Sequence, residues 1–83
     1  MKYLVLTIRG PGFDVEVLPA HYAFLDRLRG EGQLEQAGAF TDGTGGAYVL
    51  SAPDLSAALL TAENDPLHLH NCSKVTVHEW NAR

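Results

Sequence analysis

Four short segments of the chain have the composition or the alternation of apolar and polar side chains that is typical of β-strands. They are residues 2–9, 33–41, 47–51 and 73–80. Gly10-Pro11-Gly12 ends the first strand, and the glycine-rich residues 41–46 join the second strand to the third. Because Asp-Gly and Gly-Gly pairs favour tight turns, this connection predicts a hairpin.

Two further segments have helical periodicity. Pro19 suits the start of the first helix, since the missing N–H costs nothing there. The residues that share one face of this helix are His21, Phe24, Leu25 and Leu28. The second helix opens at Pro53-Asp54 and ends at Asn64-Asp65-Pro66, because the residue before a proline avoids the helical region. One side of it carries Leu55, Ala58, Leu59 and Ala62. Residues 13–18 are expected to form a loop, and residues 66–72 an irregular or short helical piece.

The order of these elements is βαββαβ, the split βαβ arrangement of the ferredoxin-like fold. We therefore expect an α+β protein with a four-stranded antiparallel sheet and two helices on one face. Both sides of the first strand are apolar, with Leu4, Leu6 and Ile8 on one side and Tyr3, Val5 and Thr7 on the other. Two helices cover only one face, so a semi-apolar face is left open. This pattern predicts a homodimer through the open sheet face, and the alternative is a monomer that uses the face as a ligand platform.

Length and charge narrow the class of protein. With 83 residues there is room for one domain, residues 1–83. The formal charge is -4 and Lys and Arg form no run, which argues against a nucleic-acid partner. No apolar stretch approaches the roughly 20 residues that cross a bilayer, and the first residues are typical of a strand, not of a signal peptide. The single cysteine, Cys72, excludes an internal disulfide and favours a reducing, cytoplasmic setting.

His21 is the first candidate for chemistry. It lies in the first turn of the first predicted helix, on the stripe that faces the core. Burial and a helix N-terminus both favour a neutral imidazole, and a neutral imidazole at the edge of a core is suited to act as a general base. The alternative is a structural histidine whose ring is hydrogen-bonded to a backbone group.

Asp65 is the second candidate. It precedes Pro66 at the end of the second helix, where an Asp-Pro pair ordinarily initiates a turn. A carboxylate in contact with the imidazole of His21 would instead hold one tautomer and raise the basicity of the ring, as in a catalytic dyad. The two predicted helices lie on the same face of the sheet, so both interpretations stay open.

Three other features predict no site. His68 and His70 alternate along the chain, but their spacing matches no zinc signature, so no metal ligand is predicted. Residues 42–46 lack the Lys-Ser/Thr pair of a phosphate loop and are better explained as the hairpin turn. Cys72 is interpreted as a packed thiol.

Several short motifs together resemble a known family. They are Met1-Lys2-Tyr3-Leu4-Val5, His21-Tyr22-Ala23-Phe24-Leu25, Ala37-Gly38, Asp42-Gly43, Gly45-Gly46 and Asp65-Pro66 with the segment up to Trp80. With these motifs the chain resembles the YciI-like (YCII-related) proteins, small members of the dimeric α+β barrel superfamily. The resemblance implies a ferredoxin-like protomer, a sheet-to-sheet homodimer and an active site built on a His and an Asp, here His21 and Asp65.

A few members of that superfamily resemble lyases, dehydrochlorinases or isomerases that act on small ring compounds. The resemblance therefore implies an enzyme without a cofactor, in which His21 moves a proton on a small, aromatic or enolisable molecule and Asp65 orients the imidazole. The expected pocket lies between helices and sheet, with Phe24, Tyr3 or Tyr48 as walls. The alternative is a metabolite-binding or accessory module without catalysis.

Overall fold

The computed structural model describes all 83 residues of the chain. The strands are β1 (Lys2–Arg9), β2 (Leu34–Ala39), β3 (Gly45–Ser51) and β4 (Ser73–Glu79). The helical segments are the 3₁₀ turn η1 (Val15–Val17) and the helices α1 (Leu18–Gly30), α2 (Leu55–Glu63) and α3 (Pro66–Leu69). None of these helices is both long enough and apolar enough to span a membrane.

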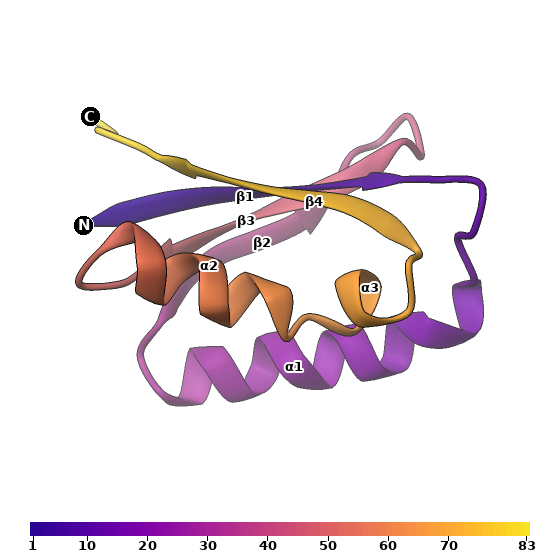
Figure 1. Cartoon of the computed structure of the whole chain (residues 1–83), viewed down its shortest axis with the longest axis horizontal. Helices are drawn as coiled ribbons and strands as arrows, with labels where there is room; N and C mark the ends of the chain where they lie inside the picture. The colour runs from indigo at the N-terminus through magenta and orange to yellow at the C-terminus, as the bar shows by residue number, and fades with distance from the viewer.

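The four strands form one antiparallel sheet in the order β2-β3-β1-β4. All three α-helices lie on the same face of this sheet, with α1 running along the bottom of the view in Figure 1. This is the ferredoxin-like arrangement, with the short α3 added before the last strand. The predicted fold class is confirmed.

The core lies between the sheet and the helices. Its largest members from the sheet are Tyr3, Val5, Tyr48 and Leu50, and those from α1 are Phe24, Leu25 and Leu28. The predicted stripe of α1 is therefore its buried side. Leu4 and Leu6 lie on the opposite face of β1, where no helix packs, and the predicted open face is present (Figure 1).

The hairpin differs from its predicted boundaries. Strand β2 covers 34–39 instead of 33–41, and β3 begins at Gly45 instead of residue 47. The Asp42 carboxylate accepts hydrogen bonds from the backbone N–H and the hydroxyl of Thr44, at 3.0 and 2.7 Å. These bonds close the turn before Gly45, so strand pairing resumes there.

The helical segments show two further differences. Residues 15–17, expected in a loop, form the turn η1, so that α1 begins at Leu18. In α2 only Ala58 and Ala62 are buried, whereas Leu55 and Leu59 stay exposed. The two small side chains let α2 lie close to the sheet, and the leucines fall on the flanks of this contact. Of the four residues expected on one side of α2, the two alanines thus pack against the sheet and the two leucines do not.

Candidate functional site

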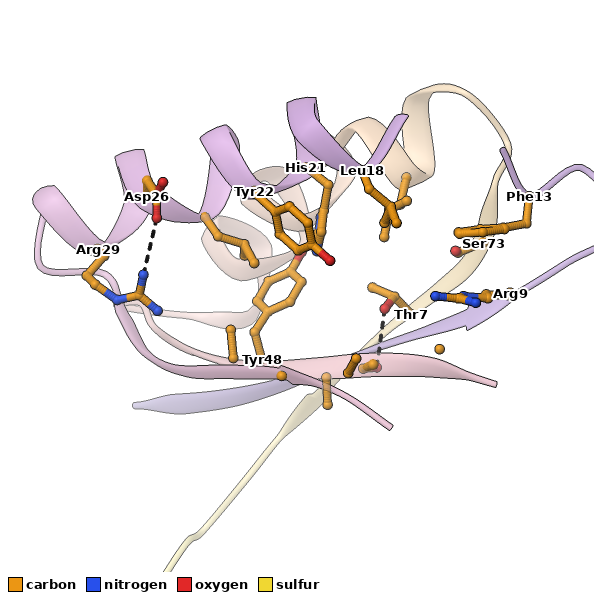
Figure 2. Close-up of a pocket in the computed structure, with 18 residues that line it drawn as sticks. Thr7, Arg9, Phe13, Leu18, His21, Tyr22, Asp26, Arg29, Tyr48 and Ser73 are labelled. Atoms are coloured by element: carbon orange, nitrogen blue, oxygen red, sulfur yellow. Dashed lines mark hydrogen bonds and ion pairs between the residues drawn. The ribbon is translucent and has the colours of Figure 1, made fainter. Parts of the chain in front are cut away.

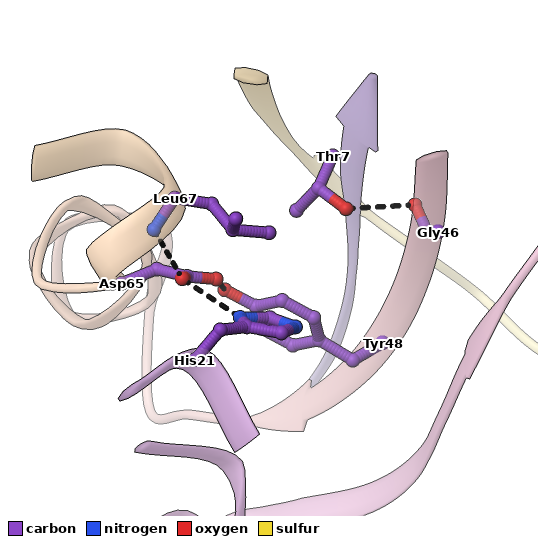
Figure 3. Close-up of polar contacts among 6 residues, drawn as sticks. All are labelled: Thr7, His21, Gly46, Tyr48, Asp65 and Leu67. Carbon is purple, nitrogen blue, oxygen red and sulfur yellow. Dashed lines mark hydrogen bonds and ion pairs between the residues drawn. The ribbon is translucent and has the colours of Figure 1, made fainter. Parts of the chain in front are cut away.

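His21 lies in the first turn of α1 and points toward the sheet (Figure 3). Pro19 helps the helix to start here, because its fixed φ is already helical and it has no N–H to leave unpaired. The His21 side chain is only 10% exposed. Its Nδ1 lies 2.8 Å from Oδ1 of Asp65, so the structure brings the two candidate residues into direct contact.

Asp65 is the N-cap residue of α3 and has a fully buried side chain. Its Oδ1 accepts the backbone N–H of Leu67 at 2.9 Å, which is the ordinary turn and capping role of an Asp before a proline. The same oxygen contacts His21. The local turn and the long-range contact therefore occur together, and the two interpretations of Asp65 do not exclude each other.

Tyr48 is the third member of this group. It projects from β3, and its hydroxyl donates a hydrogen bond to Oδ2 of Asp65 at 2.8 Å (Figure 3). Burial of the phenol, together with the negative charge of Asp65, raises the pKa of Tyr48 well above its usual value. The hydroxyl therefore stays protonated and acts as a permanent donor to the carboxylate.

These contacts determine which atom of the imidazole is free. An ionised carboxylate only accepts hydrogen bonds, so the hydrogen between His21 and Asp65 belongs to Nδ1. In the neutral ring the lone pair is then on Nε2, on the side of the ring away from Asp65 (Figure 3). A base held in one tautomer by a buried carboxylate is the arrangement that proton transfer requires.

A pocket of about 310 Å³ opens beside this histidine, between α1 and the sheet (Figure 2). Its volume lies at the lower end of the range for small-molecule sites, roughly 300–1,000 Å³. Part of its wall is bare backbone at Gly45 and Gly46. A Cβ at Gly46 would lie 2.6 Å from the carbonyl oxygen of Gly38, so only glycine lets β2 and β3 pair here.

The aromatic walls of the pocket are only partly the predicted ones. Tyr48 lines it, whereas Tyr3 and Phe24 belong to the core and do not. The Phe24 ring instead packs edge-on against Tyr48, at 6.4 Å between centroids, and supports it from behind. The apolar lining comes from side chains for which the sequence predicted no role in a site, namely Phe13, Leu18, Tyr22, Leu25 and Leu67.

The remaining sequence candidates lie outside this site. His68 is in α3 and His70 follows it, so the two do not share one side of an extended strand, and both are exposed. No group of three or more metal-ligating side chains gathers in the structure. Cys72 is buried and unpaired, as expected of a packed thiol.

Sequence reasoning missed two parts of the site. It treated Tyr48 as a wall and not as a hydrogen-bond donor, although a tyrosine on the buried face of a strand needs a partner for its hydroxyl. It also gave no role to Arg9 and Ser73, which line the pocket where β1 ends and β4 begins. Each of them lies at the end of a strand and belongs to no sequence motif, so the sequence alone did not mark them.

Fold and site together define a ferredoxin-like α+β protein with a buried His–Asp–Tyr group beside a small-molecule pocket. The family pattern of the YCII-related domain matches residues 1–81, and the chain belongs to this family. It is 45% identical over 78 residues to the uncharacterized protein YjpA of Bacillus subtilis (strain 168), a match that covers 94% of this chain and 92% of that protein. The resemblance seen in the sequence is confirmed.

Three solved structures have a similar fold. The 5-chloro-2-hydroxyhydroquinone dehydrochlorinase TftG from Burkholderia phenoliruptrix AC1100, in complex with 2,5-dihydroxybenzoquinone, has a TM-score of 0.81 at 21% identity and matches 98% of this chain and 94% of its own. Muconolactone isomerase has a TM-score of 0.73 at 18% identity, and the match covers 100% of this chain and 91% of the isomerase chain. An antibiotic biosynthesis monooxygenase has a TM-score of 0.63 at 18% identity, and the match covers 99% of this chain and 97% of the monooxygenase chain. At these identities the likeness concerns the fold.

Proposed function

We propose that the chain is an enzyme that needs no cofactor and moves a proton on a small ring compound in the pocket beside His21. The observation that carries this proposal is the 2.8 Å contact between His21 Nδ1 and the buried Asp65 carboxylate, next to a pocket that His21 lines. A dehydrochlorinase and an isomerase among the proteins of similar fold support reactions of this type.

In this mechanism Nε2 of His21 accepts a proton from an acidic C–H or O–H of the bound ring. The imidazole becomes an imidazolium, and its new positive charge is stabilised by Asp65. The electron pair left on the substrate forms an enolate or a new double bond. Return of the proton to a second atom completes an isomerisation, whereas departure of chloride completes an elimination. Tyr48 keeps Asp65 in place through the cycle.

Proton exchange in D₂O tests the proposal without knowledge of the natural substrate. A panel of cyclic enols, lactones and hydroxyquinones is incubated with the chain, and loss of the substrate proton signal is followed by NMR. We expect His21→Gln to lower the exchange rate by about 10²–10⁴-fold, the usual contribution of a general base. His68→Gln, at an exposed histidine outside the pocket, is the matched control and leaves the rate unchanged.

The same experiment distinguishes the alternative function. Exchange that continues at the wild-type rate in His21→Gln contradicts the role of His21. If compounds bind in the pocket but none of them exchanges a proton, the chain is a metabolite-binding module without catalysis. Circular dichroism of His21→Gln shows whether the fold is kept, since an unfolded variant identifies His21 as a structural residue.

We also propose that the chain forms a homodimer through its open sheet face. Leu4, Leu6 and Val49 lie on this face without a covering helix, and Trp80 beside them is 43% exposed. A shallow hollow of about 620 Å³ adjoins Leu4, Val49 and Trp80. A second copy of the sheet would cover this apolar surface.

Light scattering at micromolar concentration tests the dimer. We expect twice the 9.0 kDa mass of the chain, and Leu4→Asp is expected to give the monomer mass. The control Leu60→Asp places the same charge on an exposed residue of α2, on the helical side of the sheet, and keeps the dimer mass. A monomer mass for the wild-type chain contradicts the proposal.

A further inference from the structure

One end of the pocket carries a cation that has no anionic partner. Arg9 is the last residue of β1, and its guanidinium lies 4.1 Å from the centre of the Phe13 ring without forming an ion pair. The other arginine that lines the pocket, Arg29, is paired with Asp26 at 3.3 Å. Arg9 is thus the unbalanced positive charge of the pocket, in a chain whose net charge is -4.

A hydroxyl without a partner lies beside this cation. Ser73 is directly opposite Arg9 in the antiparallel pairing of β1 with β4, so the two side chains stand on the same face of the sheet. The Oγ of Ser73 is buried and makes no hydrogen bond within the chain. Ser73 lines the pocket, so a rotation of its short side chain would bring this hydroxyl to a ligand there, and the ligand would supply the missing bond.

The pocket is therefore polar at this end, and the proposed base His21 lies nearer its middle. Figure 2 places Arg9, Ser73 and Phe13 together at one end, whereas His21 and Tyr48 lie nearer the centre. A guanidinium offers paired N–H donors that match the two oxygens of a carboxylate. The Phe13 ring, stacked on the guanidinium, restricts the orientations that this side chain adopts.

We propose that Arg9 and Ser73 bind the carboxylate of a small cyclic acid, whose ring then lies beside His21. The consequence for catalysis rests on the proposed function, but the binding itself does not. The carboxylate accepts hydrogen bonds from the guanidinium and from the Ser73 hydroxyl, and the apolar walls enclose the ring. Arg9 and Ser73 thus set the substrate class and the orientation of the ring toward Nε2 of His21.

The test compares two probes of equal shape and different charge, benzoate and benzamide. Their binding to the whole chain is measured by NMR titration at millimolar concentration. We expect benzoate to bind the wild-type chain about tenfold more tightly than benzamide, with shifts at the Nε–H signal of Arg9. In Arg9→Gln this preference falls to near unity, and in Ser73→Ala it falls by about threefold.

Two control variants separate the possible outcomes. Arg29→Gln removes the paired arginine and keeps the preference for benzoate, whereas His21→Gln removes the proposed base and also keeps it. Equal binding of both probes by the wild-type chain, failure of both to bind, or an unchanged preference in Arg9→Gln overturns the proposal. A preference that depends on Arg9, in a chain that exchanges no substrate proton, leaves this proposal standing and contradicts only the proposed function.

Discussion

Replacement of Tyr48 by phenylalanine isolates the hydrogen bond that Tyr48 donates to Asp65. The change removes one oxygen atom and keeps the ring that packs against Phe24. Asp65 retains its two other donors, the backbone N–H of Leu67 and Nδ1 of His21. A hydrogen bond to a charged group contributes about 1.5–3 kcal/mol, so we expect Tyr48→Phe to lower the free energy of unfolding by about 2 kcal/mol. For a chain of this length that loss lowers Tm by roughly 10 °C.

The pH dependence of this loss gives a second, independent readout. Because the folded-state pKa of Tyr48 is raised, there is a pH range in which the phenol keeps its proton in the folded chain but has lost it in the unfolded chain. The stabilisation is therefore fully present below the unfolded pKa of about 10, and above it the wild-type chain loses about 1.4 kcal/mol per pH unit relative to Tyr48→Phe. The raised pKa of Tyr3 acts in both proteins and cancels from the difference.

Urea unfolding followed by circular dichroism, at fixed protein concentration from neutral pH to beyond pH ~10, measures both quantities. Tyr22→Phe is the matched control, because Tyr22 is 54% exposed and its hydroxyl makes no hydrogen bond to Asp65. Two results would refute the reasoning. One is a Tyr48→Phe variant as stable as the wild-type chain at neutral pH, and the other is a difference that does not decline above pH ~10.

Two other substitutions test the carboxylate and the pocket wall. Asp65→Asn turns an acceptor of three hydrogen bonds into an amide whose NH₂ faces a donor. We therefore expect the free energy of unfolding, measured with urea, to fall by about 2–4 kcal/mol, and proton exchange to become slower. Stability equal to that of the wild-type chain would count against a charged Asp65. Gly46→Ala would place Cβ 2.6 Å from the Gly38 carbonyl oxygen and is expected to cost about 1–3 kcal/mol. Gly38→Ala is its control, since a Cβ there meets no atom within 4 Å, and equal losses from both changes would contradict the steric argument.

The fold was predictable from the sequence because its signals are local and repeated. The side-chain period of two in β1 and the stripe of α1 each follow from a few neighbouring residues, and the turn residues fix where the strands stop. Burial does not follow from such local signals. Whether Leu59 is buried depends on how closely α2 approaches the sheet, and this distance is set by Ala58 and Ala62 together with strands far away in the chain.

The site was predictable only in part, because its contacts are long-range. His21 and Asp65 are 44 positions apart, and their pairing was inferred from family resemblance and from the two helices sharing one face. The bond from Tyr48 to Asp65 joins a strand to the turn before α3, for which no sequence pattern exists. Arg9 and Ser73 become neighbours only through the register of β1 with β4, which a single sequence does not specify.

The position of the carboxylate also explains why an acidic residue is tolerated in this core. Asp65 is fully buried, and a buried charge is costly unless it is hydrogen-bonded. Its three donors come from different elements, α1, β3 and the first turn of α3, so all of them meet only when the sheet and helices are packed. The hydrogen bonds that stabilise this charge thus also hold in place the carboxylate that orients His21. Loss of Tyr48 removes one donor and leaves the base in place, whereas loss of His21 removes a donor and the base together. Both variants should therefore lose stability, but only the loss of His21 should also remove proton exchange, which a purely structural His–Asp contact would not do.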